Sequence, residues 1–66
     1  MTDTGSARLV DRARSEFNEM PGLRLTVAQA ARLWALDGQT SEHILERLVA
    51  VGFLSRGARG AYLRAA

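Results

Sequence analysis

The sequence has no cysteine, no lysine and no long apolar run, and these absences exclude several classes of protein. Without cysteine, neither a disulfide bond nor a thiolate metal site can stabilise the fold, so side-chain packing must do so. No run of apolar residues approaches the roughly 20 that a membrane-spanning helix needs. The opening residues 1–6 also lack the basic and apolar regions of a signal peptide. We therefore expect a cytoplasmic protein without a membrane partner.

The composition is that of one small folded domain. A chain of 66 residues buries only roughly 60% of its unfolded surface, which is enough for one modest core. Hydrophobic residues make up 47% of the chain and charged residues 24%, a balance typical of globular proteins. All nine basic residues are arginine, and seven acidic residues reduce the net charge to +2. The positions of the arginines, rather than the total charge, must therefore indicate any nucleic-acid partner. Arginine in place of lysine, with abundant alanine and leucine, is typical of a bacterial protein from a G+C-rich genome.

The first apolar stripe predicts a helix that begins at the N-cap Ser6 and ends at the breaker pair Pro21 and Gly22. Residues 1–5 are small and polar, and we expect them to be a flexible N-terminus before a single domain at 6–66. The positions expected to be buried on this helix are Val10, Ala13, Phe17 and Met20.

Two further helices are predicted to follow in quick succession. Thr26 and Gln29 form a capping-box pattern at the start of one, and Asp37 is placed to cap another that runs to about Val51. Trp34 is expected to anchor the core rather than to act as an exposed stacking platform. The other positions expected on the buried faces are Ala30, Ala31, Ser41, Leu45, Leu48 and Gly52.

Short strands are predicted on both sides of this helix pair. Residues 23–25 alternate as leucine, arginine and leucine, which indicates a very short strand. Residues 53–56 and 61–64 flank a glycine-bounded loop at 57–60, which predicts a hairpin. The expected fold is therefore mainly α with a small β-hairpin, in the order helix, strand, helix, helix, hairpin.

The stretch 25–54, LTVAQAARLWALDGQTSEHILERLVAVGFL, resembles the helix-turn-helix core of bacterial winged-helix regulators such as the MarR-like group. The segments EMPGLRLT, QAARLW and LVAVGFL also resemble small bacterial winged-helix proteins, which supports the fold but adds no function. The resemblance implies a winged helix-turn-helix, with three helices, a short strand and a two-stranded wing, that binds DNA and regulates transcription. The residues that match the helix-turn-helix pattern are Leu25, Thr26, Trp34, Leu36, Asp37, Leu45, Leu48, Gly52, Phe53 and Leu54.

On this resemblance the third helix would enter the major groove of DNA. Two glutamates on its outer face, Glu42 and Glu46, make this helix a poor candidate for reading bases, because DNA phosphates repel carboxylates. We therefore expect binding of modest affinity that depends strongly on salt. The expected base-reading residues are Gln39, Thr40, His43 and Arg47, and the expected phosphate contacts are Arg24, Arg32, Arg56 and Arg59, with Arg64 beyond the wing.

Each of these assignments has a plainer structural alternative. The arginines could be solubilising charge, and the polar residues of the third helix could be an ordinary solvated face. Leu33, Ile44 and Val51 lie beside the predicted core stripes, where with Val27 they would form either an exposed strip for a homodimer or protein partner, or part of a wider core.

Catalysis is not expected from this sequence. It contains no recognisable nucleophile with its base, carboxylate dyad or phosphate-cradling glycine loop, and His43 has no second strong metal ligand near it. We therefore expect no metal, no cofactor and no small-molecule substrate. The alternative function is a protein-interaction module that keeps the winged-helix scaffold without binding DNA.

Overall fold

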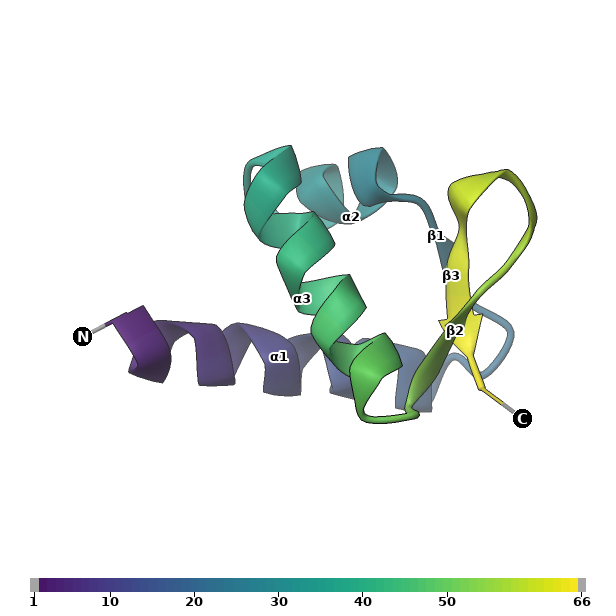
Figure 1. Ribbon diagram of the computed structural model, residues 1–66, viewed down its shortest axis with the longest axis horizontal. Coiled ribbons are helices and arrows are strands. Elements are labelled where there is room, and N and C mark those ends of the chain that lie inside the picture. The colour runs from purple at the N-terminus through teal and green to yellow at the C-terminus, as the bar shows by residue number, and fades with distance from the viewer. Residues whose placement is uncertain (1, 66) are drawn as a thin grey trace.

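The computed structural model describes residues 2–65, and side chains for 8–65. Within this range the chain is mainly helical, with one small antiparallel sheet. Helix α3 crosses α1, α2 packs against α3, and the sheet lies at the C-terminal end of α1 (Figure 1). In chain order the elements are α1 (Thr2–Glu19), β1 (Arg24–Leu25), α2 (Val27–Trp34), α3 (Gly38–Ala50), β2 (Leu54–Arg56), the short 3-10 helix η1 (Ala58–Gly60) and β3 (Tyr62–Arg64).

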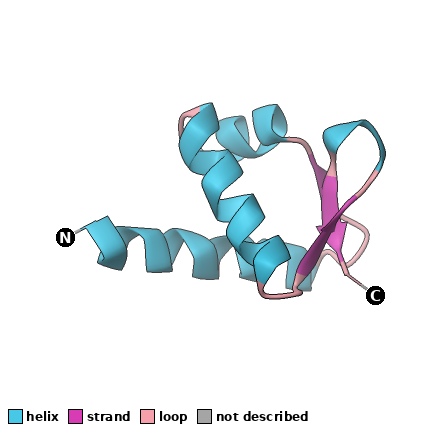
Figure 2. Cartoon of the chain, in the orientation of Figure 1, coloured by secondary structure: helices cyan, strands magenta, loops and turns pink. Residues whose placement is uncertain are grey.

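The three strands form an antiparallel sheet in the order β1-β3-β2 (Figure 2). Strands β2 and β3 make the predicted hairpin, in which Arg56 is paired with Tyr62. On the other side of β3, the short strand β1 pairs Leu25 with Tyr62. The sheet thus attaches the C-terminal hairpin to the segment that leads into α2, so both the expected short strand and the expected hairpin are confirmed.

Helices α2 and α3 begin at the caps predicted from the sequence. The Thr26 amide donates to Gln29 Oε1 at 2.9 Å, and the Gln29 amide donates to Thr26 Oγ1 at 3.2 Å, which completes the capping box. The Asp37 carboxylate accepts from the Thr40 amide at 3.2 Å. These bonds satisfy amide groups that a helix N-terminus otherwise leaves without partners.

A Schellman motif ends α3 and directs the chain into the sheet. The Phe53 amide donates to the Leu48 carbonyl and the Gly52 amide to the Val49 carbonyl, both at 2.9 Å. This pattern needs a left-handed residue, and Gly52 has a φ of 82°. The glycine therefore sets the direction in which β2 leaves the helix.

A Schellman motif also ends α2, with an alanine in the left-handed position. The Ala35 amide donates to the Arg32 carbonyl at 3.4 Å. The Leu36 amide donates to the Ala31 carbonyl at 2.9 Å, and Ala35 has φ 55° and ψ 45°. An L-residue with a Cβ atom is strained in this conformation, whereas glycine is not. The tight turn between α2 and α3 is therefore formed at a conformational cost.

We expect Ala35→Gly to stabilise the domain by roughly 0.5–1 kcal/mol, because removal of the Cβ relieves this strain. Ala31→Gly, in the middle of α2, is the matched control and should destabilise by about 1 kcal/mol, since glycine is a poor helix former. Urea unfolding of the two variants measures both effects. Destabilisation by both substitutions would contradict the strain assigned to Ala35.

The core lies where α1, α2, α3 and the sheet meet. Phe17 and Leu45 are fully buried and Trp34 is 5% exposed, so the prediction that Trp34 anchors the core is confirmed. One polar side chain joins them: the Ser41 hydroxyl is buried and donates to the Asp37 carbonyl at 2.9 Å. The buried hydrophobic residues are Ala13, Phe17, Leu25, Ala30, Trp34, Ile44, Leu45, Leu48, Leu54 and Tyr62.

The first helix differs from the prediction at both ends. It begins at Thr2 rather than after an N-cap at Ser6. Flexibility of residues 1–5 stays a prediction, since Met1 and the side chains of 2–5 lie outside what the structure describes. At the other end the helix stops at Glu19, and Met20 is 48% exposed because the chain turns there and Leu23 packs against the core instead. Ala31 is half-buried and Gly52 is exposed, so neither is a core position.

Candidate functional site

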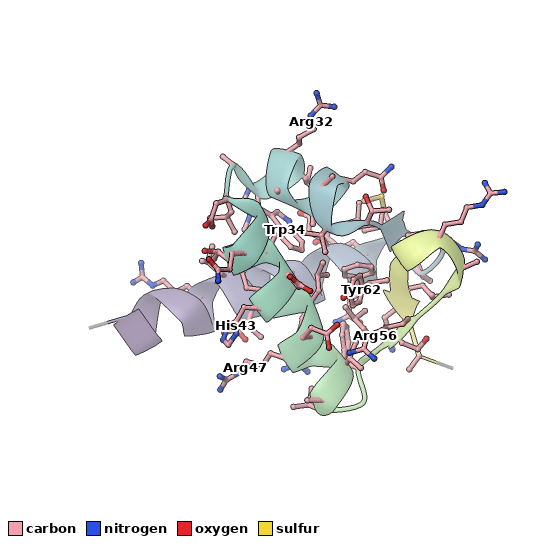
Figure 3. All side chains as sticks on the ribbon, turned by 45° about the horizontal axis from the view of Figure 1, so that its top comes forward. Arg32, Trp34, His43, Arg47, Arg56 and Tyr62 are labelled. Carbon is pink, nitrogen blue, oxygen red and sulfur yellow. The ribbon has the colours of Figure 1, made fainter. Side chains whose placement is uncertain are left out.

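The outer face of α3 carries most of the polar residues predicted to contact a partner. Burial of Ser41, Leu45 and Leu48 on the inner side turns Gln39, His43 and Arg47 to the surface. His43 and Arg47 lie on the side of α3 away from Arg56 (Figure 3).

Thr40 and Glu42 complete this part of α3. Thr40 is half-buried, and its amide donates to the Asp37 carboxylate, so its first role is in the helix cap. Hydrogen bonds from Thr40 also lower the pKa of Asp37 below its ordinary value of 3.8. Glu42 is exposed. The face of α3 therefore combines polar, basic and acidic groups.

Four exposed arginines lie on four different elements. Arg24 is on β1, Arg32 on α2, Arg47 on α3 and Arg59 in η1 at the tip of the hairpin. None of them forms an ion pair with another side chain among residues 8–65. Arg32 and Arg47 project from opposite edges of the molecule in Figure 3, so these guanidinium groups do not converge on one point.

Arg59 is held in an unusual backbone conformation. Its φ is 61°, in the left-handed region that favours glycine, within a loop closed by a hydrogen bond of 2.7 Å from the Gly57 amide to the Ala61 carbonyl. An arginine in this conformation is strained, and its side chain is exposed at the hairpin tip.

Arg56 differs from the other predicted phosphate contacts because it is already paired. Its Nε donates to Glu46 Oε2 at 2.9 Å, and its Nη2 donates to Glu46 Oε1. Tyr62 adds a third bond, from its hydroxyl to Glu46 Oε2 at 2.5 Å. Since Arg56 and Tyr62 are cross-strand neighbours, one carboxylate on α3 binds both strands of the hairpin.

These contacts change the titration of all three groups. The hydrogen bonds from Arg56, and then from Tyr62, hold the pKa of Glu46 below its ordinary value of 4.5. The Glu46 carboxylate in turn raises the pKa of Arg56, and it raises the pKa of Tyr62 above 10.0. Each shift favours the protonation states that keep the three groups bonded.

The lowered pKa of Glu46 predicts a loss of stability in acid. A carboxyl whose folded-state pKa is depressed contributes stability above its unfolded-state pKa, and this contribution is lost as the pH falls through the folded-state value. We therefore expect Glu46→Gln to melt at a lower temperature than the wild type at about pH 7, with the difference shrinking below about pH 4.5. Melting followed by circular dichroism measures it, and Glu42→Gln is the control without this contact. A difference that stays constant with pH would contradict the role given to the Glu46 carboxylate.

Arg64 is not the free phosphate contact that its position beyond the wing indicated. Its guanidinium lies over the Phe53 ring at 4.6 Å from the centroid, and its Nη1 donates to Asn18 Oδ1 at 2.6 Å. Arg14 also lies over the same ring, at 5.3 Å. Arg64 therefore joins the end of the sheet to α1.

No family model, curated protein or solved structure matches the chain.

The exposed apolar strip expected from the sequence is interrupted. Leu33 is 48% and Val51 71% exposed, but Ile44 is 1% exposed and belongs to the core. The wider-core alternative is thus correct for Ile44, because the inner face of α3 spans Ile44 as well as Leu45. Val27 is half-buried and packs against the core. Leu33 and Val51 are left as separate exposed residues.

The surface formed by residues 8–65 has no pocket, and these residues contain no group of three His, Asp or Glu side chains placed to hold a metal ion. In the same part of the chain, no helix has both the length and the apolar composition to cross a membrane. What the site does offer is a set of exposed guanidinium groups. Guanidinium binds phosphate and carboxylate oxygens, often with two hydrogen bonds.

The arrangement around Glu46 is the feature that sequence reasoning missed. From the sequence, Glu46 is expected to repel DNA, and Arg56 is expected either to contact a phosphate or to be solubilising charge. A bond between the two is not predicted. The signal that connects them is the hairpin register, which pairs Arg56 with Tyr62. The loop predicted at 57–60 would make Arg56 and Ala61 the pair that closes the hairpin, whereas Ala61 belongs to the observed loop and Arg56 pairs with Tyr62.

Proposed function

We propose that this chain is a winged helix-turn-helix domain that binds DNA. In this proposal α3 enters the major groove, the hairpin of β2 and β3 is the wing, and the role is in transcription regulation without catalysis. The observation that carries the proposal is the set of exposed arginines on β1, α2, α3 and η1, each without an ion pair among the described side chains. A B-DNA duplex presents phosphates on both sides of the groove, which suits guanidinium groups that are spread out rather than clustered.

The shape of the helix pair supports the proposal. A tight turn at residues 35–37 joins α2 to α3, and the outer face of α3 is polar and exposed. Helix α3 has 13 residues and is therefore roughly 20 Å long, a size that the major groove accepts.

The pairing of Glu46 with Arg56 also weakens one objection to DNA binding. The sequence placed two carboxylates on the groove-facing helix, and each would repel phosphates. In the free protein Glu46 is paired with Arg56, which leaves Glu42 as the unpaired carboxylate among the described residues of α3. We therefore expect modest affinity in which contacts to the DNA backbone dominate.

Fluorescence anisotropy of a labelled mixed-sequence duplex tests the proposal. The salt dependence is the slope of the logarithm of the association constant against the logarithm of the salt concentration, and each phosphate contact adds about 0.9 to it. If the four arginines each contact one phosphate, the association constant should fall about 150-fold between about 50 and 200 mM salt. An unchanged anisotropy at the lower salt, with the protein folded and in large excess, would contradict DNA binding.

A protein-interaction module is the second candidate, and the exposure of Leu33 and Val51 favours it. Burial of apolar side chains in an interface responds little to screening by salt, unlike phosphate contacts. A partner whose affinity fell on Leu33→Ser or Val51→Ser and changed little with salt would favour this candidate.

A further inference from the structure

Arg56 is held in the free protein by a group that resembles a phosphate. The Glu46 carboxylate accepts from both Nε and Nη2 of Arg56, which is the two-bond arrangement that guanidinium also forms with phosphate. We propose that Glu46 competes with DNA phosphate for Arg56, so that this ion pair opens when DNA binds and Arg56 becomes a further phosphate contact. The inference rests on the proposed DNA-binding function and adds a competing contact to it.

Burial decides which of the three bonded groups can move. Tyr62 is 6% exposed and belongs to the core, so it is fixed in place. The Arg56 side chain is 62% exposed and the Glu46 side chain 34% exposed. Arg56 can therefore leave by rotation of its own side chain, without repacking the core.

Tyr62 also limits the number of hydrogen bonds that Glu46 loses when its ion pair with Arg56 opens. Its hydroxyl donates to Glu46 Oε2, the oxygen that also accepts from Arg56 Nε, whereas Arg56 Nη2 donates to Oε1. When Arg56 leaves, the carboxylate keeps a hydrogen-bond donor and contact with solvent. The carboxylate is thus not left buried without a partner.

The exchange is favourable because the ion pair is exposed and the competitor is highly charged. Exposed ion pairs contribute little to stability, since solvent screens them and two long side chains must be ordered. A DNA backbone presents many phosphates, and each that is neutralised releases condensed counterions. Glu46 therefore lowers DNA affinity without preventing Arg56 from reaching a phosphate.

A double-mutant cycle tests this competition. Anisotropy titrations with a labelled mixed-sequence duplex, each over a series of salt concentrations, compare the wild type with Glu46→Gln, Arg56→Gln and the double variant. Glu42→Gln is the matched control, because it makes the same charge change four residues earlier on α3 at an exposed glutamate without an ion pair among the described residues. Circular dichroism confirms that each variant is folded at the temperature used.

We expect E46Q to raise the affinity about two- to fivefold more than E42Q does, which is the range that an exposed ion pair supplies. This excess should vanish in the Arg56→Gln background, because no guanidinium is left to release. Arg56→Gln should also reduce the salt dependence by about 0.9, the value for one phosphate contact.

Two results would overturn the inference. If E46Q gains no more than E42Q, Glu46 does not compete for Arg56. If R56Q leaves the salt dependence unchanged, Arg56 stays with Glu46 in the complex. Absence of wild-type binding at low salt is a different result, because it removes the proposed function itself.

Discussion

Replacement of Phe17 by alanine should destabilise the domain by about 3–5 kcal/mol, the usual cost of removing a fully buried phenylalanine. Phe17 has no exposed surface and belongs to the cluster that joins α1 to the rest of the core. Total stabilities of about 0.05–0.15 kcal/mol per residue are typical, so a loss of this size removes most of the stability of so short a chain. We therefore expect a large fraction of the F17A chains to be unfolded at 25 °C.

Met20→Ala is the control for this substitution. The sequence placed Met20 on the same buried stripe as Phe17, but it is 48% exposed and follows the last residue of α1. Its replacement should change the stability by about 0.5 kcal/mol or less. Urea unfolding followed by the fluorescence of Trp34, the single tryptophan, measures both variants. Equal losses of unfolding free energy in the two variants would contradict the end of α1 at Glu19.

Removal of two unpaired arginines should have the largest effect on DNA binding. Arg47 lies on α3 and Arg59 at the hairpin tip, and both are exposed. If each contacts a phosphate, Arg47→Gln with Arg59→Gln lowers the salt dependence by about 1.8 and weakens binding roughly 10- to 100-fold at low salt. Anisotropy titrations with the same duplex measure both quantities.

The matched control for charge is Arg8→Gln combined with Arg12→Gln. Both residues are exposed on α1, the helix on which α3 packs, and the double change alters the net charge by the same amount. It should lower the affinity only slightly and leave the salt dependence nearly unchanged. Equal losses in the two double variants would show that net charge, rather than a defined face, attracts DNA.

The order of the helices and strands, and most of their ends, could be predicted from the sequence because local signals determine them. Thr26, Gln29 and Asp37 cap their helices through bonds within three residues, so the sequence alone carries the information. Gly52 marks the end of α3 for the same reason. The sequence therefore predicts the helices, the strands and the hairpin in the correct order, whereas the first helical residue after the predicted cap Ser6 is five residues later than the observed start of α1.

Side-chain environments that depend on tertiary contacts could not be predicted in this way. Ile44 lies beside the ideal helical stripe, and only the crossing of α1, α2 and α3 shows that it is covered. Arg64 is bound to Asn18, a residue 46 positions away along the chain. Glu46 meets Arg56 and Tyr62 only once the hairpin packs beside α3. In each case the surroundings of the side chain depend on the packing of elements that are distant in the sequence, rather than on local spacing.

The most direct test of DNA binding is a two-dimensional amide NMR titration of the isotope-labelled chain with a mixed-sequence duplex, at low and at moderate salt. We expect shifts concentrated at residues 39–47 and 56–60, with little change along α1, and a decrease of these shifts as the salt concentration rises. A spectrum that stays unchanged at low salt, or shifts confined to the surroundings of Leu33 and Val51, would contradict DNA binding through α3 and the hairpin.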